Sequence, residues 1–298
     1  MSEGERRTFG ELGTRVAVAA VAIPIVLALI WFGGWFIGIP LAVFAVLGSG
    51  EAARLGERVG SHSDRLLAAG GAAALVLTAT WQVDFTSWAP WAVGILALSA
   101  PVALVRVMFR SGSEPAPIGT LGVTLLSIAY VGLGLSFGPL LVAFPAVQGW
   151  AVDSAAWAGL ALIALPLACT WVGDASAYFV GSAIGRRPLA PTISPKKSWE
   201  GFWAGVLGAG AAAALWSVLT REVLAVPLGT AGVAGLGLLL GVAAVLGDLA
   251  ESLLKREADV KDSGTFFPGH GGVLDRIDSL LFTLPLAYAL VTAVGVWA

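Results

Sequence analysis

The chain has 298 residues, of which 57% are hydrophobic and only 12% are charged. Soluble domains carry about 25% charged residues, so this chain has too few charges to cover a water-facing exterior. Its mean hydropathy of +0.87 agrees with this. The net charge is −2, and the single cysteine, Cys169, excludes an intrachain disulfide and a multi-thiolate metal cluster. We therefore predict an all-α, polytopic integral membrane protein.

Apolar runs of the length needed to span a bilayer follow one another along the chain. A spanning helix needs about 20 mostly apolar residues. By this measure we predict about nine transmembrane helices, at Val16–Phe32, Trp35–Gly48, Leu66–Trp81, Trp91–Phe109, Leu121–Phe144, Ala155–Val172, Phe202–Leu219, Gly229–Leu249 and Leu280–Trp297. The second run is the shortest of them.

The distribution of basic residues predicts how these helices are oriented. Lys and Arg are in excess in cytoplasmic loops. If the N-terminus is cytoplasmic and nine helices alternate in direction, Arg221 is the only one of the 17 basic residues placed outside. We therefore expect a cytoplasmic N-terminus and an external C-terminus, in a multi-pass protein of the cell inner (plasma) membrane.

Residues 1–298 are predicted to form a single membrane domain, because the sequence shows neither a soluble domain nor a repeat of fixed period. The helices within residues 16–144 are expected to act mainly as scaffold. Residues 155–298 are expected to form the catalytic half, with cytoplasmic loops at residues 173–201 and 247–279 that carry nearly all the informative polar residues. Both loops lie on the same predicted membrane face, so their side chains can meet at one site.

The second of these loops begins with a stripe of polar residues. In GDLAESLLK the residues Asp248, Glu251, Ser252 and Lys255 share one face of a helix. Asp248 follows a long apolar run, and a carboxylate at the membrane boundary is costly unless it is paired or binds a cation. Two interpretations stay open: Asp248 is a functional carboxylate, or it is an interfacial one paired with Lys255 or Arg256.

A second acidic pair follows a glycine-rich turn. Asp275 and Asp278 are three residues apart at the expected start of a helix, where Asp275 could also serve as a helix cap. The preceding PGHGG turn contains His270. Carboxylates that hold Mg²⁺, surrounded by cationic donors, are what phosphoryl or nucleotidyl transfer requires. Four basic residues are close in sequence: Lys255, Arg256, Lys261 and Arg276.

The first loop adds the segment SPKKSWEG, which contains Ser194, Lys196 and Lys197. Taken alone, such a basic loop is explained by the general excess of positive charge on the cytoplasmic side, or by contact with anionic lipid. Asp174, just after the sixth predicted helix, is ambiguous. The chain has no Walker-type glycine loop and no dinucleotide fingerprint, so kinases and NTPases of those classes are not supported.

The segment from Ser252 to Asp278 resembles the signature of the phosphatidate cytidylyltransferases, also called CDP-diacylglycerol synthases. It contains SLLKR, KDSG and PGHGGVLDRID in order, with no departure from the family pattern. SPKKSWEG and the Gly173-Asp174 pair are similar to earlier segments of that family. The N-terminal half matches the family only in being a set of membrane helices.

The resemblance implies that CTP and phosphatidic acid give CDP-diacylglycerol and pyrophosphate at the cytoplasmic membrane face, for phospholipid biosynthesis, with Mg²⁺ as cofactor. It also implies a homodimer, and nucleic acid is not an expected partner. The implied catalytic residues are Asp248, Lys255 and Asp275, and the implied metal ligands are Asp248, Asp275 and Asp278. The groups implied to bind substrate are Ser194, Lys196, Lys197, Ser252, Arg256, Lys261, His270 and Arg276.

Two other classes of protein would share some of these features. A secondary transporter also has many spans, but its polar residues should cluster near the middle of the bilayer rather than at one face. A membrane enzyme that uses CTP with an isoprenoid-type lipid would share the phosphate chemistry. Apolar pockets decide between acyl and isoprenoid lipids, and the sequence does not reveal them.

Overall fold

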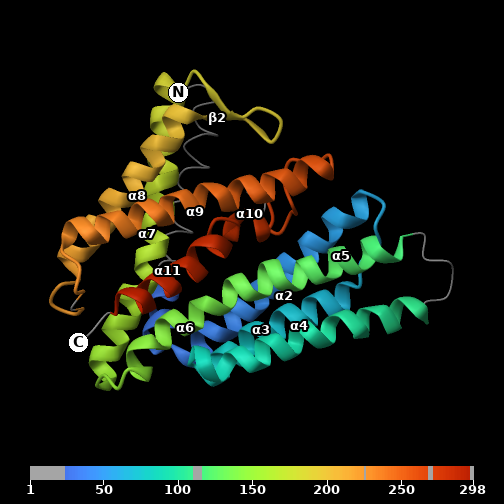
Figure 1. Ribbon diagram of the computed structural model, residues 1–298, viewed down its shortest axis with the longest axis horizontal. Coiled ribbons are helices and arrows are strands. Elements are labelled where there is room, and N and C mark those ends of the chain that lie inside the picture. Colours follow the sequence, from blue (N-terminus) through green and yellow to red (C-terminus); the bar gives the residue numbers. More distant parts are fainter. Residues whose placement is uncertain (1–23, 110–115, 225, 268–270, 296–298) are drawn as a thin grey trace, which may run out of the picture.

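The computed structural model describes residues 24–109, 116–224, 226–267 and 271–295 (Figure 1). Within them the chain is mainly helical, as predicted. Residues 24–32 form a helix, and the helices after it are α2 (Gly34–Arg58), α3 (Arg65–Gln82), α4 (Phe85–Met108), α5 (Pro117–Ser127), the π-helix η1 (Ile128–Leu133), α6 (Gly134–Val147), α7 (Val152–Ile184), α8 (Trp199–Leu219), α9 (Thr230–Glu257), α10 (Leu274–Ile277) and α11 (Leu280–Val294).

A short hairpin is the exception to the predicted all-α class. Strands β1 (Pro188–Ala190) and β2 (Ser194–Ser198) pair antiparallel, with Pro188 opposite Ser198 and Ala190 opposite Ser194. The hairpin lies within the first predicted loop, where pairing satisfies backbone groups that an open loop would leave to water. The loop that carries SPKKSWEG is therefore an ordered element rather than an irregular connection.

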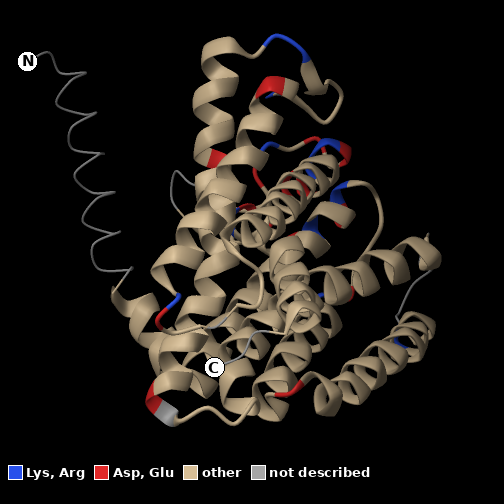
Figure 2. Cartoon of the chain, turned by 60° about the vertical axis from the view of Figure 1, so that its left-hand side comes forward, with Lys and Arg blue, Asp and Glu red and all other residues tan. Residues whose placement is uncertain are grey.

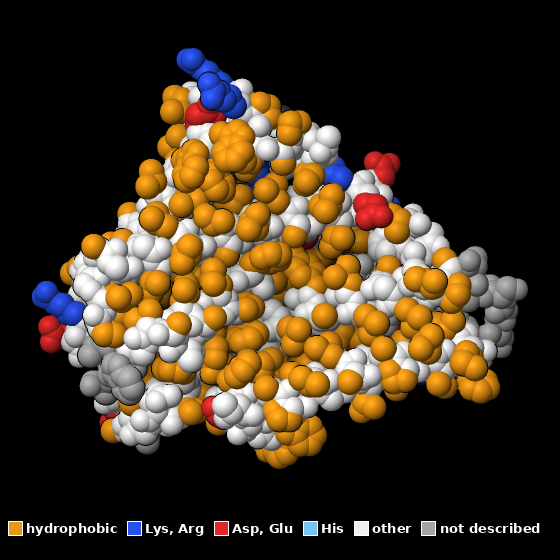
Figure 3. All heavy atoms as spheres, in the orientation of Figure 1, with side chains coloured by type: hydrophobic (Ala, Val, Ile, Leu, Met, Phe, Trp, Pro, Cys, Tyr) orange, Lys and Arg blue, Asp and Glu red, His pale blue; other side chains and the backbone are white. Residues whose placement is uncertain are grey.

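Seven of the described helices are long and apolar enough to cross a membrane. Figure 3 shows apolar side chains over most of the visible face, as expected for a surface that contacts lipid. The chain is therefore a polytopic membrane protein. Helix α3 is not among the seven, and the first predicted span extends beyond the described residues. The count of nine spans and the orientation of the termini thus stay predictions.

Three helices continue past the ends that the apolar runs predicted. Helix α2 reaches Arg58 instead of Gly48, α7 reaches Ile184 instead of Val172, and α9 reaches Glu257 instead of Leu249. The apolar runs predicted the membrane-spanning part of each helix, which is the part that lipid can accept; the helices extend further because backbone hydrogen bonds continue into polar sequence. Helix α9 includes the predicted stripe from Asp248 to Lys255, and Asp174, expected just after the sixth span, also lies within a helix.

Helices α7 and α8 form an antiparallel pair that crosses the group made by α2 to α6 (Figure 1). The backbones of the pair approach closely because glycines face each other, with Gly173 against Gly205 and Gly181 against Gly201. Small residues at helix contacts are typical of membrane proteins, where dispersion rather than the hydrophobic effect drives packing. Helix α9 packs against both members of the pair and against α11.

Charged side chains are sparse and unevenly distributed. Figure 2 shows many of them around the hairpin and the C-terminal end of α9. The hairpin is anchored there, because Arg256 Nε on α9 donates a hydrogen bond to the Ile193 carbonyl at 3.1 Å. The fold therefore brings the two segments that the sequence singled out to one end of the molecule.

Candidate active site

A cavity of about 500 Å³ lies between α7, α8, α9 and the hairpin. Its floor and walls combine acidic and basic side chains with apolar ones. Helix α7 contributes Asp174, the hairpin contributes Lys196 and Lys197, and α9 contributes Asp248. The apolar lining includes Ala177, Leu189, Phe202 and Val245. The cavity is thus suited to a ligand that has both a charged and an apolar part.

An ion pair joins the two predicted segments inside this cavity. Lys197 Nζ lies 2.5 Å from Asp248 Oδ2, and the two side chains are 25% and 35% exposed. Ser252, one turn along α9, donates its hydroxyl to Asp248 Oδ1 at 3.3 Å. The predicted alternative, in which Asp248 pairs with Lys255 or Arg256, is therefore wrong: Asp248 is paired, but with Lys197. The lysine comes from the hairpin, which is distant in sequence.

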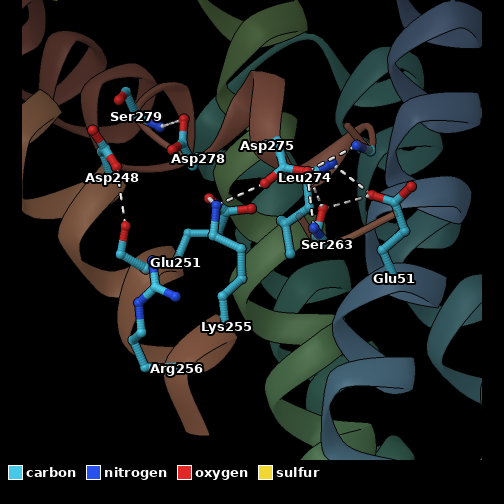
Figure 4. A network of polar contacts seen from close by, with 12 residues as sticks. Glu51, Asp248, Glu251, Lys255, Arg256, Ser263, Leu274, Asp275, Asp278 and Ser279 are labelled. Atoms are coloured by element: carbon cyan, nitrogen blue, oxygen red, sulfur yellow. Dashed lines mark hydrogen bonds and ion pairs between the residues drawn. The ribbon is translucent and has the colours of Figure 1, made fainter. Parts of the chain in front are cut away.

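A second group of charges lies further towards the C-terminal end of α9. Lys255 Nζ donates to Glu251 Oε2 at 2.5 Å and to Asp275 Oδ1 at 2.7 Å (Figure 4). Glu251 is fully buried, and the side chains of Lys255 and Asp275 are 12% and 10% exposed. One ammonium group therefore neutralises part of the charge of two carboxylates, which lowers the cost of burying them.

The Asp275 carboxylate is also held by the loop before it. Its Oδ2 accepts hydrogen bonds from the amides of Ser263 at 2.9 Å and Gly272 at 2.8 Å, and from the Ser263 hydroxyl at 2.9 Å. The backbone at Gly271 has a φ of 84°, which favours glycine. Asp275 stands in the first turn of α10, whose N-cap is Val273 with no side-chain cap hydrogen bond, so the predicted capping role is wrong and the Asp275 carboxylate bonds to the preceding loop instead.

Asp278 is half-buried at the end of α10, and its Oδ1 accepts the Ser279 amide at 2.6 Å. It lies close to Asp248 in Figure 4, and both Asp248 and Asp174 act on it electrostatically. Carboxylates thus outnumber the lysines in this region, and such an excess of negative charge attracts a cation.

A metal ion at this site would need carboxylates that are free to bind it. Among the described residues, no three acidic, histidine or cysteine side chains already stand together as a metal site. Mg²⁺ does not require such a cage, because it binds through one or two carboxylates together with substrate phosphates and waters. Asp248 and Asp278 suit it in this respect. Asp275 is less available, because four contacts from described protein donors hold its carboxylate, whereas two hold that of Asp248.

Other residues predicted to bind substrate lie at the edge of this region. Ser194 is in β2, and Arg256, Lys261 and Arg276 are exposed. Arg256 donates to the hairpin backbone at Ile193. His270 lies outside the described residues. The structure therefore brings together Lys196, Lys197, Asp248, Ser252, Lys255, Asp275 and Asp278.

Two buried carboxylates in this network were not predicted as site residues. The sequence pattern places Glu251 only on the helical stripe, and it gives Glu51 on α2 no role. Glu51 is 3% exposed and accepts the Leu274 amide at 2.8 Å. A carboxylate inside an apolar helix is a functional candidate by default, and this signal could have identified Glu51. Residues 16–144 thus supply a member of the polar network as well as scaffold.

Comparison with known proteins agrees with the signature segment. Residues 13–294 match the cytidylyltransferase family. The phosphatidate cytidylyltransferase of Synechocystis sp. is 32% identical over 93% of this chain and 95% of its own length. That of Bacillus subtilis is 44% identical over 44% of this chain and 48% of its own length. That of Brucella abortus biovar 1 is 37% identical over 55% of this chain and 64% of its own length. The predicted resemblance is thereby confirmed, and the chain belongs to the cytidylyltransferase family.

Proposed function

We propose that this protein transfers the cytidylyl group of CTP to phosphatidate, giving CDP-diacylglycerol and pyrophosphate in phospholipid biosynthesis. The observation that carries the proposal is the meeting of Lys197 and Asp248 in a cavity whose walls are membrane helices. A charged cavity between membrane helices suits a lipid phosphate together with a nucleoside triphosphate, because the lipid arrives from the bilayer and the nucleotide from water. The family and its relatives named phosphatidate cytidylyltransferases support the same reaction.

In this reaction a phosphate oxygen of the lipid attacks the α-phosphorus of CTP. A new P–O bond forms as the bond to the pyrophosphate oxygen breaks, and pyrophosphate carries away the electron pair. A general base is not needed, because the attacking phosphate is already anionic. The chain contributes positioning and charge neutralisation, which are the main sources of rate in phosphoryl-type transfers.

Each part of the site has a role in this scheme. Lys196 and Lys197 on the hairpin are suited to contact substrate phosphates, and Lys197 would exchange its contact with Asp248 for one with phosphate. Lys255 keeps Asp275 in place. The apolar lining beside Phe202 and Val245 suits the glycerol and acyl part of a lipid.

Mg²⁺ is part of the proposal, with Asp248, Asp275 and Asp278 as its ligands. Asp248 and Asp278 would bind first, because Asp275 must loosen its contact with Lys255 to take part. When bound, Mg²⁺ would reduce the negative charge of the triphosphate that otherwise opposes attack.

The proposed setting is the cytoplasmic face of the inner membrane, with the protein as a homodimer. The excess of Lys and Arg in one set of loops supports this orientation. A site at that face lets the acyl chains stay in hydrocarbon while the headgroup reaches the hairpin.

A test of the reaction uses purified protein in lipid nanodiscs with labelled CTP. Phosphatidate, a polyprenyl phosphate and no acceptor are compared, with Mg²⁺ or with EDTA. We expect CDP-diacylglycerol and pyrophosphate in equal amounts, only with phosphatidate and only with Mg²⁺. Transfer to the polyprenyl phosphate alone would assign the isoprenoid-type reaction instead. Failure with every acceptor would overturn the proposal.

A further inference from the structure

The polar network of the site extends into the first half of the chain through Glu51. This residue lies on α2, and its side chain is almost completely removed from solvent, at 3% exposed. Glu51 Oε2 accepts hydrogen bonds from the Leu274 amide at 2.8 Å and the Ser263 hydroxyl at 3.2 Å. Both donors belong to the segment that leads into α10. A buried carboxylate is costly unless donors satisfy it. Here the donors come from residues 258–274 of the signature, which we call the signature loop.

Glu51 and Asp275 share one of these donors. The Ser263 hydroxyl lies 3.2 Å from Glu51 Oε2 and 2.9 Å from Asp275 Oδ2. Asp275 in turn contacts Lys255, which contacts Glu251. Figure 4 shows this series of contacts running from α2 to α9. A shift of the Glu51 carboxylate would therefore move Ser263, and with it the position of Asp275.

The loop also fits tightly around the Glu51 carboxylate. A Cβ added at either Gly264 or Gly272 would overlap its oxygen atoms. The two glycines therefore let the backbone surround a side chain from another part of the chain. A contact that only filled space would not require glycine on both sides of a carboxylate.

We propose that Glu51 is a positioning residue, which holds the segment from Ser263 to Leu274 so that Asp275 and Lys255 keep their places in the site. This inference rests on the proposed reaction. Glu51 does not touch substrate; it acts through Ser263 and the Leu274 amide. Groups that orient those in contact with a metal or substrate typically change activity by about 10- to 100-fold when removed.

The test compares Glu51→Ala, Glu51→Gln and a control, Ser49→Ala, in the full-length protein. Ser49 is buried on the same helix, but among the described residues its hydroxyl bonds only to Val46 of that helix. We expect Glu51→Ala to lower kcat about 10- to 100-fold. Glu51→Gln keeps an oxygen for both donors, so it should retain most of the activity, and Ser49→Ala should retain all of it.

A second readout follows the loop itself. Thr265 is exposed in the loop, and the native Cys169 is buried, so a Thr265→Cys variant can be labelled with a maleimide. We expect labelling to be several-fold faster when Glu51→Ala is added, and unchanged when Ser49→Ala is added. Equal labelling rates would overturn the proposal, even if the parent protein proved inactive on phosphatidate.

Should Glu51→Ala not fold, Ser263→Ala decides the matter. It removes the shared hydroxyl but keeps the Ser263 amide bond to Asp275. We expect kcat to fall with little change in melting temperature. A Ser263→Ala variant with the parent's kcat and labelling rate would refute the positioning role.

Discussion

Asp248 meets Lys197 in a contact that is too exposed to contribute much to stability. With side chains 35% and 25% exposed, the pair contributes less than about 1 kcal/mol to folding. Its position in the cavity is better explained by ligand binding. The Lys197 ammonium group contacts the Asp248 carboxylate, which a bound cation would also contact. A substrate phosphate would in turn attract the Lys197 ammonium group.

We therefore predict that Asp248→Asn separates activity from stability. The amide keeps the size but removes the charge, so turnover should fall at least about 100-fold, or require much more Mg²⁺. The melting temperature should change little. Asp259→Asn is the matched control, because Asp259 is exposed just beyond α9 with a φ of 51°, which Asn also tolerates. Near-parental turnover and Mg²⁺ dependence in Asp248→Asn would rule out the metal assignment.

Tyr130 on η1 carries a buried hydroxyl close to the acidic residues of the site. Its hydroxyl is buried, and among the described residues it has no hydrogen-bond partner. Asp278, Glu251 and Asp248 act on it electrostatically. Short π-helical segments are frequent at functional sites, and a buried, unpartnered hydroxyl lowers stability.

We predict that Tyr130→Phe raises the melting temperature, because it removes the unpartnered group at an expected gain of about 1 kcal/mol. Tyr288→Phe is the control. The Tyr288 hydroxyl is not among the buried, unpartnered groups of the described residues, so its loss should bring no comparable rise in the melting temperature. Thermal unfolding of both variants in the same detergent tests the prediction, and a lower value for Tyr130→Phe contradicts it.

At the scale of elements, the hairpin β1–β2 gives the basic segment a fixed position. Lys196 and Lys197 stand on β2, which is held by pairing with β1 and by Arg256 on α9. A loop that only followed the general excess of positive charge would need no such anchoring. The hairpin is therefore suited to present its lysines to a ligand in the cavity.

We predict that Lys196→Ala and Lys197→Ala each lower turnover while membrane insertion and melting temperature stay at the parent's values. The reason is that each lysine lines the cavity without being part of the packed core. Arg187→Ala serves as a control, because Arg187 lies on the same loop but outside that cavity. Parental activity in both single variants and in the double variant would leave only contact with anionic lipid as the role of these lysines.

The whole molecule has one end where the hairpin, the end of α9 and the signature loop meet. If that end is cytoplasmic, cysteines placed there should react only with reagents added on that side. A cysteine can be labelled only where the reagent reaches it. Ser198 and Ser263 lie at this end but are buried, whereas Thr192 and Thr265 are exposed and suit the experiment. We expect Thr192→Cys and Thr265→Cys to be labelled from the cytoplasmic side, and Asp153→Cys from the other side. Labelling of the first two from opposite sides would contradict a shared site.

The sequence alone determined the class of the protein and predicted most of the residues that the structure brings together at the candidate site. Low charge and long apolar runs require a lipid surface, and both are properties of composition that tertiary contacts do not alter. The stripe of Asp248, Ser252 and Lys255 was predictable because helical spacing is local. The signature from Ser252 to Asp278 identified the family for the same reason, since its residues are close in sequence.

Only the tertiary structure decided which charges meet. Lys197 pairs with Asp248 because α7 and α8 pack through glycines and carry the hairpin to α9. Glu51 reaches the signature loop because α10 packs against α2. Contacts of this kind depend on the packing of whole helices, and no local periodicity encodes them. The ends of α2, α7 and α9 followed the same rule, because packing and backbone hydrogen bonds, rather than hydropathy, determine where a helix ends.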